Sequence, residues 1–397
     1  MPPVETLDLI PPCRTKWPEL APAGQGLGPS DIALWFTPKL LITSTAQFKA
    51  MPNRRASAPR PAPSSKDTGP VTLSMVAKAA GVSSSTVSRI LNGTAAVHES
   101  KSKAVHEAIA KLGFVPNPMA RGLAGGRTLS IGVVTQSIDS PFYGVALRGI
   151  EDELDRAGYS PLFVSGHWNA SEEARCIDML RSRRVDGIIV LTGRLSDAAL
   201  KATAKQLPVV ATGRSLKAPN LFSLHFDNQL GARLATQHLI SLGHRRIAFI
   251  AGNAEHPDAN ERLKGYQSAL EEAGIAFDPE LIGQGLFHEE SGLLATERLL
   301  DTRRRFTALF AANDQMALGA CLALHRRGLL IPGDVAVMGF DDLSISRYST
   351  PPLSTIHHPA YELGQCAASA MLGLLRGEKP RLQLPGPKVI ARESTSA

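Results

Sequence analysis

The stretch that decides the fold of the N-terminal part of this chain is Val71-Thr-Leu-Ser-Met-Val-Ala-Lys-Ala-Ala-Gly-Val-Ser-Ser-Ser-Thr-Val-Ser-Arg-Ile-Leu-Asn92. Thr72 is placed to cap a short first helix, Gly81 to form a turn, and Ser83 to cap a second helix. The apolar inner side is supplied by Val82, Val87 and Ile90, and the outer side by Ser84, Ser85, Ser88 and Arg89. This pattern predicts a helix-turn-helix, whose second helix suits the DNA major groove. The alternative is an ordinary helical hairpin on a protein surface.

A third helix and a short connecting segment follow. Residues 100–112 place Val105, Ile109 and Leu112 on one side, so they predict an amphipathic helix that closes a small three-helix core. Residues 116–126 run from a proline to a glycine pair and are too short to hold a helix alone in water. From the residues alone, a plain linker and a helical turn or two both remain open there.

The positive charge of the chain is concentrated around this predicted module. The formal net charge is +7, and residues 71–127 hold 7 Lys and Arg against 2 Asp and Glu. Residues 1–70 hold 8 against 5, which leaves 28 basic and 29 acidic residues in 128–397. A basic module on a near-neutral body predicts a polyanionic partner for that module only.

The first 70 residues have the composition of a disordered leader. They contain 13 of the 28 prolines and end in a run rich in Arg, Ala, Ser and Pro that cannot bury a core. The sequence shows no secretory signal and no apolar run of about 18 residues, which predicts a cytoplasmic protein without a membrane span. The four cysteines are scattered without a CxxC pair, so we expect free thiols and no structural metal.

From Leu129 onward the sequence alternates between apolar runs and helical patterns. Apolar runs lie at 129–135, 161–165, 186–191, 209–212, 246–252, 307–312 and 334–339. Helical patterns lie at 141–157, 171–183, 196–206, 258–273, 289–300 and 314–327. The alternation predicts an α/β core of two lobes, each a doubly wound parallel sheet covered by helices. A ligand would then bind in the cleft beyond the carboxyl ends of the strands.

Several aromatic and polar side chains follow the ends of these predicted strands. Phe142 and Tyr143 are placed to stack on a flat or ring-shaped ligand, and Arg262 and Asp314 to bond its hydroxyls. For Asp314 the alternative is a helix cap formed with Asn313. The chain has no GxSxG, P-loop or HExxH motif. We therefore expect that the protein is not an enzyme, and that it has no catalytic residue and binds no metal and no cofactor.

Several stretches together resemble the lactose repressor/galactose repressor family of bacterial transcriptional regulators. Besides residues 71–92 they are Phe114-Val-Pro-Asn-Pro-Met-Ala-Arg-Gly-Leu123, Ala312-Asn-Asp-Gln-Met-Ala-Leu-Gly319, Val337-Met-Gly-Phe-Asp-Asp342 and Pro352-Leu-Ser-Thr-Ile356. The resemblance runs from about residue 71 to 393. It implies a headpiece that binds operator DNA as a homodimer, and a core similar to periplasmic sugar-binding proteins with a small effector between its lobes.

The resemblance assigns roles to individual residues. Ser84 and Ser85 fall at base-reading positions, and Arg89 falls at a base or phosphate contact. The phosphate-contact positions are Thr72, Ser83, Thr86, Ser88 and Asn92. A hinge helix matches Asn117, Ala120, Arg121 and Leu123, with Leu123 as a minor-groove wedge. The effector-pocket positions are Phe142, Asp227, Arg262, Phe287 and Asp314, beside Tyr143.

Within the family, the stretch Ser140-Pro-Phe-Tyr-Gly144 looks most like the galactose repressor branch. The purine repressor is also similar, but His256 stands where its pattern has an arginine that reads the purine. We therefore expect a neutral hexose or small glycoside as effector, with galactose-like sugars the first to test. A purine-type corepressor is the alternative effector.

The resulting domain plan is a disordered leader at 1–70, a helix-turn-helix headpiece at 71–116, a hinge helix at 117–127 and a two-lobed effector-binding and dimerisation core at 128–397. We interpret the chain as a transcriptional regulator, and as a repressor in preference to an activator. The alternatives from other classes are a stand-alone sugar-binding protein and a nucleotide-cofactor enzyme. The sequence leaves open the effector, the operator, and whether dimers pair into tetramers.

Overall fold

The structure is a computed structural model of the 397-residue chain. It describes residues 71–92, 97–115, 126–302 and 304–396. The leader predicted at 1–70 lies outside the described residues. So do the predicted hinge positions Asn117, Ala120, Arg121 and Leu123.

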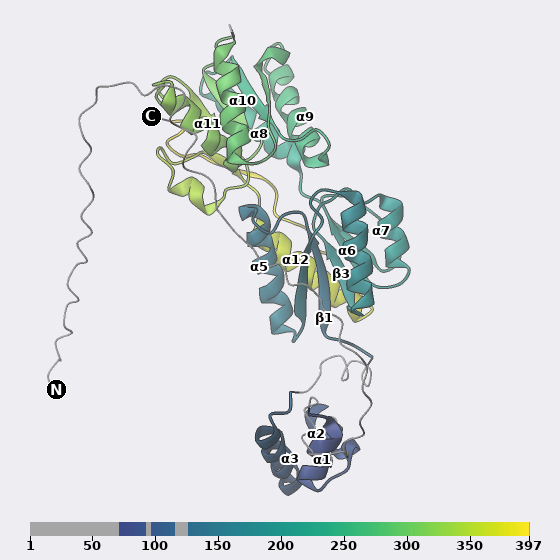
Figure 1. Cartoon of the computed structure of the whole chain (residues 1–397). Coiled ribbons are helices and arrows are strands. Elements are labelled where there is room, and N and C mark those ends of the chain that lie inside the picture. The colour runs from purple at the N-terminus through teal and green to yellow at the C-terminus, as the bar shows by residue number, and fades with distance from the viewer. Residues whose placement is uncertain (1–70, 93–96, 116–125, 303, 397) are drawn as a thin grey trace, which may run out of the picture. The chain divides into compact units, whose positions relative to one another are not determined.

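Three short helices form the N-terminal domain, as the sequence predicts (Figure 1). They are α1 (Leu73–Ala80), α2 (Ser84–Asn92) and α3 (Glu99–Leu112). The Thr72 side chain accepts a hydrogen bond from the Met75 amide, and Ser83 Oγ accepts one from the Thr86 amide at 3.2 Å. Gly81 ends α1 with a φ of 65°, a left-handed conformation that glycine adopts without strain. The caps and the turn read from the sequence are therefore confirmed.

The three helices bury a small apolar core and leave one side of α2 in solvent. Val76, Val87 and Val105, one from each helix, are fully buried. Ser84 and Ser85, predicted to face DNA bases, are exposed on the same helix that buries Val87. The amphipathic pattern of this helix is thus the one that the sequence indicates.

The first lobe of the core is a five-stranded parallel sheet covered by helices (Figure 1). Its strands stand in the order β2 (Ser160–Ser165), β1 (Ser130–Thr135), β3 (Gly187–Val190), β4 (Val209–Thr212) and β5 (Leu221–Leu224). Helices α5 (Pro141–Arg156), α6 (Ala170–Ser182) and α7 (Asp197–Ala204) follow β1, β2 and β3. The neighbouring residues Ile188 and Ile189 pack into different apolar clusters, because helices cover both faces of the sheet.

The second lobe repeats this architecture with a four-stranded parallel sheet. Its strands stand in the order β7 (Ile282–Gln284), β6 (Ile247–Ala251), β8 (Ala308–Ala311) and β9 (Ala336–Met338). Its helices are α8 (Asn228–Ser241), α9 (Pro257–Glu272), α10 (Glu289–Asp301) and α11 (Asp314–Arg326), with short 3-10 turns at Pro279–Leu281 and Ser344–Arg347. An antiparallel pair, β10 (Thr355–His357) and β11 (Lys388–Ile390), packs beside α8. The predicted core of two α/β lobes is confirmed.

Helix α12 (Ala360–Leu375) packs in the first lobe, although it follows the second lobe in the sequence. It crosses α5 closely at two glycines. A Cβ atom on Gly149 would lie 2.2 Å from the carbonyl oxygen of Tyr361, and one on Gly364 would lie 2.0 Å from that of Ala146. The chain therefore passes from β10 back to the first lobe, and then returns to the second lobe at β11. The sequence patterns do not predict α8, α12, β5, β7, β10 or β11.

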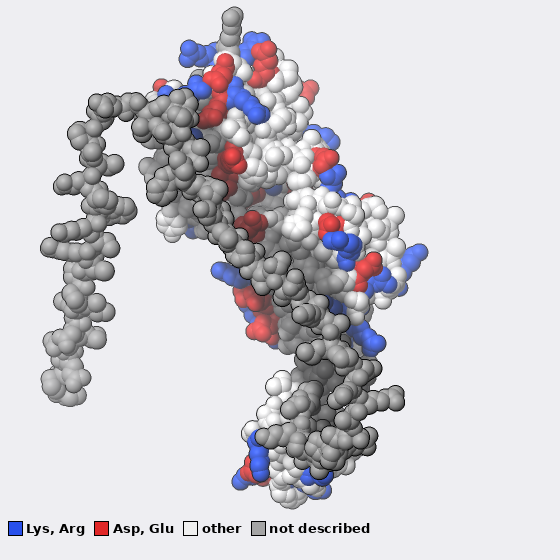
Figure 2. All heavy atoms as spheres, in the orientation of Figure 1, with Lys and Arg blue, Asp and Glu red and all other residues white. Residues whose placement is uncertain are grey.

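The described residues on the face drawn in Figure 2 carry charges of both signs. Lys and Arg are interspersed with Asp and Glu over the visible face of the molecule (Figure 2). No helix in the described part of the chain is both long and apolar enough to cross a membrane.

Asp314, predicted as an effector contact, is a buried structural carboxylate. One of its oxygens accepts hydrogen bonds from the Leu343 amide at 2.8 Å and the Ser346 hydroxyl at 2.6 Å, and the other accepts one from the Thr355 hydroxyl at 2.6 Å. Its side chain is fully buried and does not line the cavity between the lobes. In this structure Asp314 ties α11 to the segment after β9, and its contact with an effector stays a prediction. The cap of α11 is Asn313, whose side chain accepts a backbone hydrogen bond.

Replacing Asp314 with alanine leaves three buried donors without their acceptor. We expect the free energy of unfolding to fall by about 3–5 kcal/mol. Asp227→Ala is the matched control, because it removes an exposed carboxylate that caps α8, and should cost about 1 kcal/mol. Urea unfolding followed by circular dichroism measures both changes. Small and equal changes in the two variants would contradict the structural role of Asp314.

Candidate functional site

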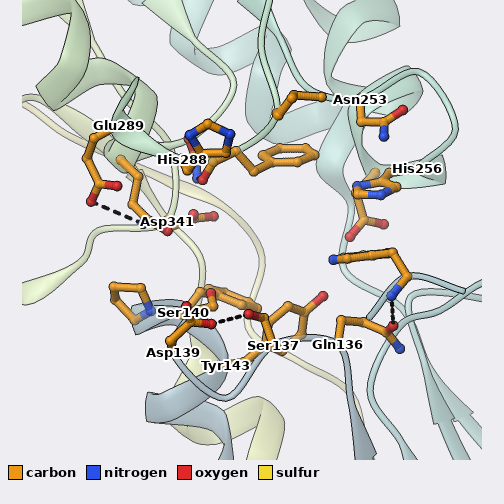
Figure 3. A pocket seen from close by; sticks show the side chains of 18 of the residues that line it. Gln136, Ser137, Asp139, Ser140, Tyr143, Asn253, His256, His288, Glu289 and Asp341 are labelled. Atoms are coloured by element: carbon orange, nitrogen blue, oxygen red, sulfur yellow. Dashed lines mark hydrogen bonds between the residues drawn. The ribbon is translucent and has the colours of Figure 1, made fainter. Parts of the chain in front are cut away.

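A cavity of about 760 Å³ opens between the two lobes (Figure 3). Its walls are the segments that follow the carboxyl ends of β1, β2, β6, β7, β8 and β9. This is where ligands bind in parallel α/β folds, and where the sequence predicts the cleft. Phe142, Tyr143, Arg262 and Phe287, all predicted effector contacts, line the cavity.

Arg262, in the first turns of α9, is the fixed cation of the cavity wall. Its Nε donates to Asn228 at 3.0 Å, and one terminal nitrogen donates to the carbonyl oxygen of Ala312. The other terminal nitrogen lies 3.5 Å from a carboxylate oxygen of Asp341. The guanidinium also sits 3.8 Å from the centre of the Phe340 ring. Because Arg262 is buried and held on every side, it presents one orientation to a ligand.

Two carboxyl groups, those of Asp258 and Asp341, line the cavity near Arg262. Burial raises the pKa of both, and it raises that of Asp341 to about 7 although Arg262 opposes the rise. Asp341 has a φ of 113° and the next residue, Asp342, a φ of 56°. Asp341 lines the cavity, and backbone strain at it and at the residue next to it indicates a functional constraint on this part of the wall. A carboxylate beside a fixed guanidinium suits a ligand that both donates and accepts hydrogen bonds.

Aromatic rings supply the apolar part of the cavity wall. Trp168 of the first lobe stacks on His256 of the second, with ring centres 3.6 Å apart and planes at 17°. His256 in turn lies parallel to Phe287 at 5.5 Å. Burial lowers the pKa of His256 to about 4, so the imidazole is neutral at physiological pH. The rings offer apolar faces of the kind that pack against the weakly apolar face of a sugar.

The buried side-chain amide of Gln136 holds the loop that carries Trp168. Gln136 accepts a hydrogen bond from the Trp168 amide at 2.9 Å and donates to the carbonyl oxygen of Thr192. Trp168 also has a φ of 54°, so its backbone is held in a left-handed conformation that is costly for tryptophan. This arrangement fixes the indole in the wall of the cavity.

Asp227, the remaining predicted effector contact, does not line the cavity. Its carboxylate caps α8 by accepting a hydrogen bond from the Leu230 amide at 2.8 Å, and the residue is exposed. The structure thus places Asp227, like Asp314, outside the cavity wall. In both cases a carboxylate at a helix start satisfies the protein's own donors. Phe142, Tyr143, Arg262 and Phe287 remain predicted effector contacts.

Three residues of the cavity wall were not predicted from the sequence: Asp258, Asp341 and Trp168. Asp341 had a usable signal, because it follows the run that became β9, as a ligand-binding residue of such a fold should. Trp168 follows β2 in the same way. Among the described residues, no group of three or more His, Cys, Asp or Glu side chains is arranged to hold a metal ion.

Comparisons with known proteins agree with this architecture. The family model "Bacterial regulatory proteins, lacI family" matches residues 72–117, and "Periplasmic binding protein-like domain" matches residues 236–395. The chain is 35% identical over 329 residues to the HTH-type transcriptional regulator GalR of Escherichia coli (strain K12), covering 82% of this chain and 96% of that protein. It is 34% identical to the ribose operon repressor of Haemophilus influenzae over 325 residues, 81% of this chain and 98% of the repressor.

Solved structures show the same likeness. The lac repressor dimer bound to operator and the anti-inducer ONPF has a TM-score of 0.76 at 32% identity, covering 83% of this chain and all of that one. The transcriptional regulator CelR in complex with cellobiose has a TM-score of 0.61 at 35% identity, covering 82% of this chain and 99% of that one. From the helix-turn-helix to the two-lobed core, this chain belongs to the lacI family of bacterial regulatory proteins.

Proposed function

We propose that this chain is a sequence-specific DNA-binding transcriptional regulator, acting as a homodimeric repressor, whose operator affinity is set by a sugar-like effector in the cleft. The observation that carries the proposal is the combination of two sites in one chain. An exposed helix-turn-helix suits DNA, and the cavity between the lobes presents fixed charges opposite aromatic faces. A stand-alone sugar-binding protein would not need the first of these sites.

On the DNA side, the serines at the start of α2 offer few paired contacts to base edges. Ser84 and Ser85 each have one hydroxyl, whereas Arg89 offers a guanidinium that can bond two acceptors of one guanine. We assign much of the base discrimination to Arg89. The hinge positions Asn117 and Leu123 would add minor-groove contacts, with Leu123 as the wedge.

Removal of the Arg89 side chain should therefore weaken specific binding. We expect Arg89→Ala to raise the Kd for a duplex selected by the wild-type chain from a random library by about 10- to 100-fold. Lys111→Ala, which removes an equal charge from the last turn of α3, is the matched control and should have a much smaller effect. Fluorescence anisotropy gives both constants. Similar effects in both variants would show that only charge matters, and would count against the base-reading role.

On the effector side, we propose a neutral sugar or small glycoside. The ion pair of Arg262 with Asp341 supplies an acceptor and donors for hydroxyls, and Trp168 and Phe287 supply ring faces. The similar structure of CelR contains cellobiose, which supports a sugar here. The purine-type alternative is less favoured, because neutral His256 lies at the position where that branch carries an arginine.

Sugar binding through Asp341 should depend on pH. Because the pKa of this carboxyl group is raised to about 7, it loses its proton near neutrality, and the ionised form is the stronger acceptor. For a sugar found in a thermal-shift screen, we expect affinity to rise between about pH 6 and 8 in the wild type. Asp341→Asn should bind about 10- to 100-fold more weakly and lose this dependence. Calorimetry at several pH values tests the assignment, with Asp227→Asn as control. An unchanged pH profile in Asp341→Asn would refute it.

Further parts of the proposal concern the rest of the chain. We propose that the protein is cytoplasmic, works without a cofactor and has no catalytic role. We further propose that residues 1–70 are dispensable for DNA and effector binding. This part of the proposal rests on their proline-rich composition.

A further inference from the structure

An arginine after the end of α6 has a left-handed backbone conformation. After other helices of the core, the residue with this conformation is a glycine. Arg184 has a φ of 57°. Helices α5, α8, α9, α11 and α12 are instead followed by Gly158, Gly243, Gly274, Gly328 and Gly377, with φ angles of 74°, 93°, 65°, 69° and 78°. Glycine adopts this left-handed region without strain, whereas arginine does not. The strain at Arg184 therefore calls for a reason beyond ending a helix.

The side chains of Arg183 and Arg184 have no partner in the described part of the chain. Both residues are exposed, and neither guanidinium makes an ion pair or hydrogen bond with another described residue. Arg181, in the last turn of the same helix, pairs with Asp178 at 3.0 Å. The carboxylate closest in sequence, that of Asp186, is already occupied by other donors. These two cations are therefore available to an external anion.

The loop that carries them is fastened to the start of the core. Asp186 accepts hydrogen bonds from the amides of Thr128 and Leu129, both at 2.8 Å. The Thr128 hydroxyl donates to the carbonyl oxygen of Arg184 at 2.9 Å. Arg183, Arg184 and the entering residues line a concavity of about 530 Å³. The two guanidinium groups are thus anchored beside the point where the chain enters the core.

The position of this loop in the chain limits its distance from the headpiece. Val115, the last described residue of the headpiece, and Gly126 are separated by residues 116–125. A chain of this length spans at most about 40 Å even when fully extended. A DNA duplex carries one negative charge per about 1.7 Å of its axis, so an operator bound by the headpiece brings many phosphates within this range.

We propose that Arg183 and Arg184 bind backbone phosphates of the same operator duplex that the headpiece binds. This inference rests on the proposed function as a DNA-binding regulator. Guanidinium groups bond phosphate oxygens in pairs, and such contacts add affinity without reading sequence. A glycine at position 184 would relieve the backbone strain, but it would have no guanidinium to bind a phosphate. In this proposal the phosphate contact is the reason for an arginine at this strained position.

Arg184→Gly separates this role from a structural one. Relief of strain predicts a Tm that is equal to that of the wild type or higher by about 2 °C. Removal of the guanidinium from its phosphate predicts weaker operator binding. It also predicts a slope of log Kd against log salt that falls by about one for each phosphate that is no longer neutralised. The measurement is anisotropy with the full chain and its selected duplex over about 50–200 mM salt.

A charge-matched pair of variants completes the test. Arg183→Gln/Arg184→Gln removes two charges from this loop, and Arg245→Gln/Arg246→Gln removes two exposed charges from the loop before β6 in the second lobe. We expect only the first pair to reduce the salt slope. The proposal is overturned if both pairs behave alike, if Arg184→Gly is destabilised, or if it binds DNA with an unchanged slope. Failure of the wild-type chain to select any duplex would instead overturn the proposed function itself.

Discussion

The buried guanidinium of Arg262 is the interaction on which the inner wall of the cleft depends. It joins α9 to Asn228 at the start of α8, to the end of β8 through Ala312, and to Asp341 after β9. Removing a charge of this kind from water is costly unless each of its donors has a partner. The segments that follow three strands of one sheet are therefore held in register by one side chain. Asp314 extends this network through donors that follow Asp341 in the sequence, those of Leu343 and Thr355.

The sequence predicted elements well where periodicity and length were clear. The seven apolar runs became strands and the six helical patterns became helices, each within a few residues. Short strands such as β7 and β10 were missed because three residues hold too little alternation to stand out from a loop. Helix α12 was missed for the opposite reason. It buries Ala, Gly and Leu on nearly every side, so it shows no polar stripe to mark a helical period.

The cleft was harder to predict than the sheets around it. The rule that ligands bind at strand ends located the cavity, but it did not separate carboxylates that serve the fold from those that face the ligand. Asp227, Asp314 and Asp341 all follow strands. The first two satisfy donors of their own or neighbouring segments, and this depends on residues such as Thr355, which lies 41 positions from Asp314. The spacing of residues along the sequence does not reveal such long-range donors.

The two walls of the cleft differ in chemistry, and this difference bears on how an effector acts. The buried charges, those of Arg262 and Asp341, belong to the second lobe, and their bonds do not involve the first. The first lobe contributes Phe142, Tyr143 and Trp168. Rotation of the lobes would leave the contacts between Arg262 and Asp341 intact and change their distance from the rings of the first lobe.

A ligand that uses both walls therefore gains its full binding free energy at one lobe separation only. Trp168 and His256 already touch across the cleft, and Arg194 of the first lobe pairs with Glu255 of the second, so the lobes have contacts of their own that oppose a change. An effector shifts such an equilibrium only by the difference between its affinities for the two states. In this chain that difference arises because the hydroxyl-binding charges and Phe287 lie on the second lobe, whereas Phe142, Tyr143 and Trp168 lie on the first. This arrangement is the physical basis on which an effector of the proposed class would control DNA binding.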